Sequence, residues 1–242
     1  NLLVGYSGLI SFAHAAFYGI GAYATTLIMM KFGINFFLSL IAGIFISSFL
    51  SLLIAYPSLK LKGDYFVLAS LGFQIIVFSI LYNWISLTKG PYGIPGIPRP
   101  NIFNFEIENP FSFFIFSGII FYIIFLFFRY VYNSPYGRVL KTIREDEIAS
   151  ASLGKDIPAI KIWAFAISSG IAAIAGALYA GYVTYIDPTS FTFDESMFII
   201  SIVILGGSGN LKGPLIGTLF MVILPEILRF LGLPDTVAPN VR

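Results

Sequence analysis

Residues 134–161 read SPYGRVLKTIREDEIASASLGKDIPAIK, and this stretch decides how the rest of the chain is arranged. It is the longest charged segment, and the sequence on both sides of it is almost entirely apolar. A charge at the centre of a bilayer costs roughly 2.5–3.5 kcal/mol even on a lenient insertion scale. The segment holds too many Lys, Arg, Asp and Glu residues to bear that cost repeatedly. We therefore expect it to lie in water between two membrane-spanning segments.

Two short helices are predicted within this stretch. Ser134 is a typical N-cap and Pro135 suits the first helical position, which predicts a helix start. A second helix is predicted over residues 146–153, with acidic residues in its first turn and Gly154 as its stop. Helical spacing gives it one small, mildly apolar face, made of Ile148, Ala149, Ser152 and Leu153. That face suits a groove on another protein. The alternative, a surface loop that only joins two membrane helices, stays open on these residues alone.

The composition is that of an integral membrane protein. The chain has 242 residues, 57% hydrophobic and 11% charged, with a mean hydropathy of +0.89. A soluble domain carries about 25% charged residues. We expect an all-α fold, a polytopic transmembrane helical bundle forming one domain over residues 1–242, with membrane lipid as a partner. The net charge of +2 is too small to indicate nucleic acid, and the absence of Cys excludes disulfides and Cys-ligated metal.

Apolar segments predict the spans. A membrane helix needs about 20 predominantly apolar residues. About seven segments span or partly span on this criterion: 9–30, 36–56 (ended by Pro57), 65–85, 111–130, 160–183, 197–205 and 215–230. The 197–205 segment is too short to span unless it begins near Thr192. The Phe-rich segment 111–130 is expected to face lipid. The first segment is so rich in glycine that we expect a broken or half-depth helix there, as transporters use near the substrate path.

Loop charges predict the orientation. If residues 134–161 are cytoplasmic, alternation of the spans puts 57–63 and 206–213 on the same side, and that side carries more Lys and Arg. The long loop 86–110 then faces the exterior. Its prolines and glycines predict ordered turns, which either receive a substrate-delivery protein or pack as a lid on the helix ends. We also expect that the sequence is a piece of a longer chain, with further elements before Asn1 and beyond Arg242.

Small residues at helical spacing predict the interior helices, because helices in lipid associate through close packing of small side chains. Two i, i+4 ladders and one GxxxG occur: Ser7, Ser11, Ala15, Gly19; Ser169, Ala173, Ala177, Gly181 (with Ala172, Gly176 and Ala180 on the adjoining row); and Gly213 with Gly217. We expect the helices that carry these ladders to lie in the interior of the bundle, near a translocation path. Its candidate residues are Ser11, His14, Gly19, Gly21, Gln74, Ala173 and Ala177. For His14, the only histidine, a structural hydrogen bond is favoured over substrate contact.

Three separated motifs carry a resemblance to a known family. Glu147-Ile-Ala-Ser-Ala-Ser-Leu-Gly154 resembles the E-A-A…G loop of ABC-importer permeases, and departs from it at Ile148, where Ala is usual. The wider string from Ser134 to Gly154, the glycine-rich GYSGLISFAHAAFYGIGAY and the tail SFTFDESMFIISIVILGGSGNLKGPLIG are similar to the branched-chain amino acid permeases of the LivM/LivH type. The resemblance implies that residues 134–158 are a cytoplasmic coupling loop. It places the ATPase contacts at Glu147, Ile148, Ala149, Ser152, Leu153 and Gly154.

The resemblance also implies the assembly: a second homologous permease, two ABC ATPase subunits and an extracytoplasmic binding protein, in a prokaryotic inner membrane. The transported solute would be leucine, isoleucine or valine, with urea, short amides or another small polar solute as the alternative. No G-x-x-x-x-G-K-[ST] sequence occurs, so ATP would be used by the partner subunits. The chain itself is expected to be no enzyme, with no catalytic residue, metal or cofactor.

Two other classes of protein remain as rivals. A passive channel or an ion-coupled transporter could have a similar number of helices. A proton-driven transporter normally needs ionisable groups inside the membrane, and here Asp64, Asp194, Glu195 and Glu226 all lie near predicted span ends. An intramembrane enzyme is disfavoured because no cluster of catalytic side chains occurs at membrane depth.

Overall fold

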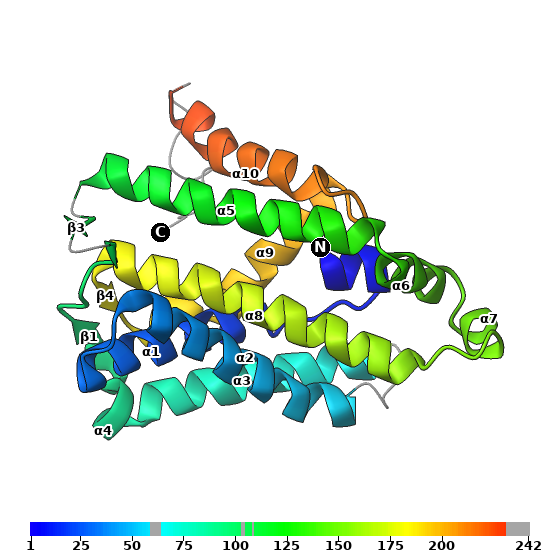
Figure 1. Ribbon diagram of the computed structural model, residues 1–242, viewed down its shortest axis with the longest axis horizontal. Coiled ribbons are helices and arrows are strands. Elements are labelled where there is room, and N and C mark those ends of the chain that lie inside the picture. The colour runs from blue at the N-terminus through cyan, green and yellow to red at the C-terminus, as the bar shows by residue number, and fades with distance from the viewer. Residues whose placement is uncertain (59–63, 103–104, 108, 231–242) are drawn as a thin grey trace.

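The computed structural model describes residues 1–58, 64–102, 105–107 and 109–230, and these residues are overwhelmingly helical (Figure 1). The helices are η1 Leu2–Ser7, α1 His14–Phe32, α2 Phe36–Ser58, α3 Asp64–Asn83, α4 Ile85–Thr88, η2 Gly90–Tyr92, α5 Pro110–Asn133, α6 Pro135–Glu145, α7 Glu147–Ser152, α8 Ile157–Val183, η3 Pro188–Phe191, α9 Phe193–Gly206 and α10 Gly213–Phe230. Two-residue strands form two antiparallel pairs: β1 Ile94–Pro95 with β4 Tyr185–Ile186, and β2 Asn101–Ile102 with β3 Phe105–Glu106. The predicted all-α bundle is confirmed.

Within the described residues, four helices are long and apolar enough to cross a membrane: Phe36–Ser58, Tyr65–Asn83, Pro110–Asn133 and Ile157–Val183. They match four of the predicted segments. The other three predicted segments correspond to α1, α9 and α10, which do not meet that criterion. The prediction that the 197–205 helix would have to begin near Thr192 is confirmed, because α9 begins at Phe193. The helix has 14 residues.

The first predicted segment is broken, as its glycines indicated. η1, a π-helix, ends at Gly8 in the left-handed conformation with φ 69°. An irregular stretch follows, and α1 begins only at His14. The predicted ladder from Ser7 to Gly19 is therefore wrong as one helical row, because Ser7 and Ser11 precede α1 and lie outside its helical geometry. Only Ala15 and Gly19 belong to α1.

Pro57 does not end its helix. α2 runs through it to Ser58, so the predicted boundary is wrong by two residues. A proline removes one backbone donor and crowds the carbonyl four residues before it. Near a helix end this affects few hydrogen bonds, so the helix can continue past the proline.

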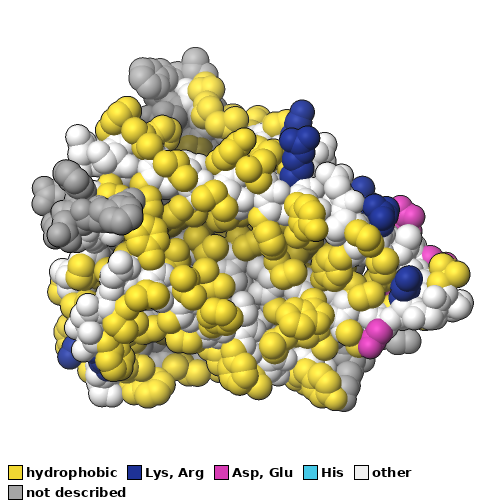
Figure 2. All heavy atoms as spheres, viewed as in Figure 1, with side chains coloured by type: hydrophobic (Ala, Val, Ile, Leu, Met, Phe, Trp, Pro, Cys, Tyr) yellow, Lys and Arg dark blue, Asp and Glu magenta, His cyan; other side chains and the backbone are white. Residues whose placement is uncertain are grey.

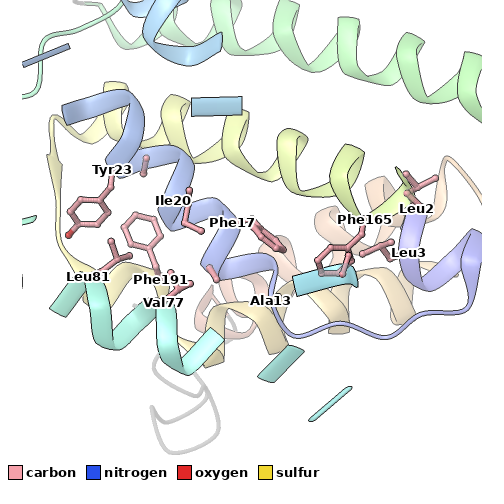
Figure 3. Packing of buried hydrophobic residues seen from close by; sticks show 14 of the residues in the cluster. Leu2, Leu3, Ala13, Phe17, Ile20, Tyr23, Val77, Leu81, Phe165 and Phe191 are labelled. Carbon is pink, nitrogen blue, oxygen red and sulfur yellow. The ribbon is translucent and has the colours of Figure 1, made fainter. Parts of the chain in front are cut away.

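Helix α1 lies at the centre, packed against α8, α2 and α3. Figure 3 shows Phe17 of α1 toward Phe165 of α8, and Tyr23 of α1 beside Phe191, which lies next to Leu81 and Val77 of α3. The approach of α1 to α8 depends on small residues. A Cβ atom on Gly176 would lie 1.9 Å from the carbonyl oxygen of Tyr18, and one on Gly21 would lie 2.2 Å from the Cα of Ala173. The prediction that 160–183 is an interior helix is confirmed.

Helix α5 lies on the outside. Only 11% of its most apolar 18-residue stretch is buried, whereas 50% of the corresponding stretch of α8 is buried. Many of its large apolar side chains are exposed, whereas Phe113 and Phe116 are buried on the side that faces the bundle. Figure 2 shows this apolar surface spread across the middle of the molecule. The predicted outer position of the Phe-rich segment is confirmed.

The molecule has two distinct ends (Figure 1). α6, α7 and the turn between α9 and α10 lie at one end, so residues 134–161 and 206–213 share that end as predicted. The predicted third member, 57–63, lies mostly outside the described residues. The opposite end carries α4 and the pairing of β1 with β4, where Ile97 N–H donates to Thr184 O at 3.1 Å. The described part of loop 86–110 is thus ordered and packed on the helix ends.

Candidate functional site

Helix α6 begins as its sequence predicts. Ser134 Oγ accepts a hydrogen bond from Gly137 N–H at 3.3 Å, and Pro135 occupies the first helical position. Leu140 and Ile143 are buried beneath the helix. Gly137 sits against the Val131 and Tyr132 carbonyls, so close that a Cβ there would come within 2.4 Å of the first. α6 is therefore fixed to the end of α5.

Helix α7 is a single short helix held between two caps. Asp146 Oδ1 accepts hydrogen bonds from Ile148 N–H and Ala149 N–H, both at 2.9 Å. After Ser152 the chain leaves the helix and Gly154 takes a positive φ of 73°. The predicted helix over 146–153 with a glycine stop is confirmed, with its outermost residues acting as caps.

The outward face of α7 is apolar in a charged part of the molecule. Ile148 and Leu153 are 80% and 76% exposed, and Ala149 and Ser152 are exposed beside them. Figure 2 shows charged side chains gathered around this end and apolar atoms at its tip. Exposed apolar residues rimmed by polar ones are typical of a protein contact surface. The structure thus brings four of the predicted coupling residues, Ile148, Ala149, Ser152 and Leu153, together on one surface.

Glu147 points back to the protein. Its Oε2 atom accepts a hydrogen bond from Lys161 Nζ of α8 at 2.8 Å, and the two side chains are 57% and 11% exposed. One residue away, Tyr136 Oη donates to Ile160 O at 2.8 Å, and burial raises the pKa of that phenol above its ordinary value. These two bonds join α7 and α6 to the first turns of α8. Sequence reasoning missed both pairings, because no local spacing relates residues on different elements.

Arg144 joins three elements at the same end. Its Nη1 donates to the carbonyl oxygen of Gly5 in η1, and a Cβ on Gly209 in the α9–α10 turn would lie 2.8 Å from the same nitrogen. Asn1 reinforces this junction: Gly209 N–H donates to Asn1 Oδ1 at 3.0 Å, and Asn1 Nδ2 donates to Asn210 O at 2.8 Å. The sequence offered no signal for these contacts beyond the charge of Arg144.

The predicted path residue Gln74 is buried and both ends of its amide are used. Oε1 accepts from Ala16 N–H at 2.6 Å, and Nε2 donates to Phe191 O at 2.8 Å. Ser196 Oγ similarly accepts from Ala15 N–H at 2.9 Å. The first N–H groups of a helix have no partner within it, so Gln74 and Ser196 cap the buried start of α1.

The remaining path candidates are placed as follows. His14 Nδ1 lies 3.1 Å from Ser11 O, consistent with the favoured structural hydrogen bond, and Ser11 Oγ accepts from Ala13 N–H at 3.3 Å. Four small residues pack between helices of this one chain: Gly19, Gly21, Ala173 and Ala177. A role of any of the seven in lining a path stays a prediction.

Among the described residues, no three His, Cys, Asp or Glu side chains gather closely enough to hold a metal ion. At the α6–α7 end, a short helix presents an exposed apolar face, and the Glu147–Lys161 ion pair links that helix to the bundle.

The chain matches a family model described as the permease component of branched-chain amino acid transport systems, over residues 1–240. It belongs to this family. It is also similar to individual curated relatives. One is the high-affinity branched-chain amino acid transport system permease protein LivM of Salmonella typhimurium, 35% identical over 95% of this chain and 59% of that protein. Another is the probable LivM of Methanocaldococcus jannaschii, 32% identical over 94% of this chain and 76% of that protein.

A more distant relative is LivH of Escherichia coli, 28% identical over 92% of this chain and 77% of that protein. The chain spans 59% of the length of the first two LivM relatives that it matches. No solved structure matches it. Together with the four apolar helices, membership in this family makes the chain an integral protein of the inner membrane.

Proposed function

We propose that this chain is the membrane-spanning part of a permease subunit in an ATP-driven ABC importer of branched-chain amino acids. Support comes from the family match over residues 1–240 and from relatives named for that transport. In this proposal two homologous permeases, two ABC ATPase subunits and an extracytoplasmic binding protein form the working assembly. The chain itself performs no hydrolysis and needs no cofactor of its own.

The observation that carries the proposal is α7. An importer driven by a separate ATPase needs a rigid, water-exposed element through which the ATPase moves the membrane helices. α7 has the required features: an apolar outward face at Ile148 and Leu153, capped ends, and an ion pair with α8 behind it. Amphipathic helices of this kind dock in grooves of partner proteins.

The transported solute enters from the end that carries α4, β1 and β4, where the binding protein docks on the ordered loop. It leaves at the α6–α7 end. Leucine, isoleucine and valine are the proposed cargo, and the choice among them rests mainly with the delivery protein.

The test uses the full complex reconstituted in proteoliposomes, with the ATPases and the binding protein from the same operon. Leucine uptake is expected to require ATP. The double variant Ile148→Asp, Leu153→Asp is expected to lose the ATPase subunits on purification and to lower uptake by about tenfold or more, the change that corresponds to roughly 1.4 kcal/mol of docking free energy. The matched control for retention of the ATPase subunits is Tyr92→Asp, an equally exposed residue at the opposite end; its uptake is not used as a control, because the binding protein is proposed to dock on that loop.

Two results would contradict the proposal. Leucine flux through the permease alone, without ATPase subunits, would indicate a channel. ATP-dependent uptake of urea but not of leucine, isoleucine or valine would replace the cargo while leaving the ATPase docking intact.

A further inference from the structure

Helix α7 has few ties to the rest of the protein. It has six residues, and only Ser150 among them is buried. The hydroxyls of Ser150 and Ser152 bond back to carbonyls of residues 146 and 148, inside the same segment. Within the described part of the chain, the bond from Glu147 to Lys161 is the one side-chain hydrogen bond or ion pair from α7 to α8.

Lys161 is suited to hold that bond. Its side chain is 11% exposed, whereas Glu147 is 57% exposed. A lysine ammonium that loses its anionic partner in such a position is left without compensation for its lost hydration. The pair therefore favours one position of α7 over others, with the lysine on the packed helix α8 and the glutamate on the exposed helix α7.

Lys161 also stands at the base of the most deeply packed span. From its position near the start of α8, the helix rises to the contacts of Ala173 with Gly21 and of Gly176 with Tyr18 on α1. These contacts leave no room between the two helices. A displacement of the first turns of α8 therefore moves α1 as well, because no flexible side chain lies between them to absorb the movement.

We propose that Lys161 is the positioning residue of the coupling device: its ion pair with Glu147 holds α7 against α8 and transmits the movement of the ATPase to the span. This inference rests on the proposed function. In this inference Glu147 binds Lys161 within the permease, and Ile148 and Leu153 make the contact with the ATPase.

The first experiment needs only the permease. The chain has no Cys, so spin labels at Ser152→Cys on α7 and Tyr130→Cys on α5 report the position of α7 in lipid nanodiscs. Lys161→Glu and Glu147→Lys are each expected to broaden the distance distribution. The swap Lys161→Glu with Glu147→Lys is expected to narrow it again, and Lys155→Glu, an exposed lysine of the same loop, to leave it unchanged.

The second experiment uses the full complex. Each single reversal is expected to retain the ATPase subunits and ATP hydrolysis but to raise the ATP consumed per leucine transported, and the swap is expected to restore the ratio. Lys161→Met, which keeps the apolar stem, serves if a reversal fails to fold. It should broaden the distances and raise the ratio as well.

Unchanged distances and unchanged coupling in Lys161→Met, or a swap that restores neither readout, would overturn the inference. Absence of uptake by the wild-type complex would instead overturn the proposed function, while the spin-label distances would still decide whether Lys161 holds α7.

Discussion

Gly176 and Tyr18 meet where α8 crosses α1, with the glycine directly against the tyrosine carbonyl. Inside a bilayer, apolar side chains are already out of water, so the hydrophobic effect does not hold two helices together. They associate instead through van der Waals contacts, which require close approach. A single methyl group at Gly176 would prevent this close approach of α8 to α1. The ladder of small residues is thus the residue-scale basis of the bundle.

We predict opposite effects for two glycine-to-alanine changes. Gly176→Ala places a Cβ 1.9 Å from the Tyr18 oxygen, and overpacking of this kind costs about 1–3 kcal/mol. Gly118→Ala on the lipid-facing α5 meets no atom within 4 Å and should stabilise through helix propensity. Thermal unfolding in detergent measures both. Equal melting temperatures for the two variants would contradict the close α1–α8 contact.

A second residue-scale prediction concerns Gln74. Gln74→Leu leaves Ala16 N–H and Phe191 O without their side-chain partner in the protein interior, at a cost of about 1–3 kcal/mol for each unsatisfied group. Asn83→Ala is the control, because that amide bonds to Ser79 O on an exposed face of its own helix. Chemical denaturation of both variants should show a loss of stability in the first alone.

At the scale of elements, α7 is the shortest helix with a functional assignment. Isolated helices shorter than about 12 residues are only marginally stable in water. The stability of α7 must therefore come from its caps and from its ion pair with α8. The Asp146 carboxylate provides two bonds at the first turn.

Asp146→Ala is therefore expected to loosen α7 by about 0.5–2 kcal/mol and to weaken ATPase binding, by up to about tenfold where the loss reaches 1.4 kcal/mol. Asp146→Asn should retain most of the affinity. Asp156→Ala removes a similar cap, to Ala159 N–H, but from α8, a 27-residue helix that is held by packing. Binding measured by ATPase co-purification should stay normal in that control; a matching loss there would argue against a specific effect on α7.

Element boundaries show what local pattern can and cannot predict. Ser134, Pro135, Asp146 and Gly154 act through their immediate neighbours, and each does what its residue type indicates. Pro57 misled the prediction of a helix end, because the effect of a proline depends on how much helix follows it. Two bonds join separate elements: Glu147 with Lys161, and Arg144 with the Gly5 carbonyl. No periodicity in the sequence indicates which charged side chain will meet which partner.

At the scale of the whole molecule, the charges and the fold agree. Residues 134–161 and 206–213 meet at one end, the ordered loop with β1 and β4 lies at the other, and apolar helix surfaces lie between (Figures 1 and 2). The alternation of the apolar spans and the Lys and Arg of the loops predict this arrangement. They did not indicate that the candidate path residues Gln74, Gly21 and Ala173 would be closely packed inside a single chain, since burial depends on which helices become neighbours.

Single-cysteine labelling tests the central claim, that α7 faces the cytoplasm, most directly. The chain has no Cys, so Ser152→Cys on α7 and Tyr92→Cys at the opposite end can each be probed with a membrane-impermeant maleimide. The account predicts labelling of Tyr92→Cys on intact cells or spheroplasts and of Ser152→Cys only in inverted vesicles. Labelling of Ser152→Cys from outside intact spheroplasts would contradict it.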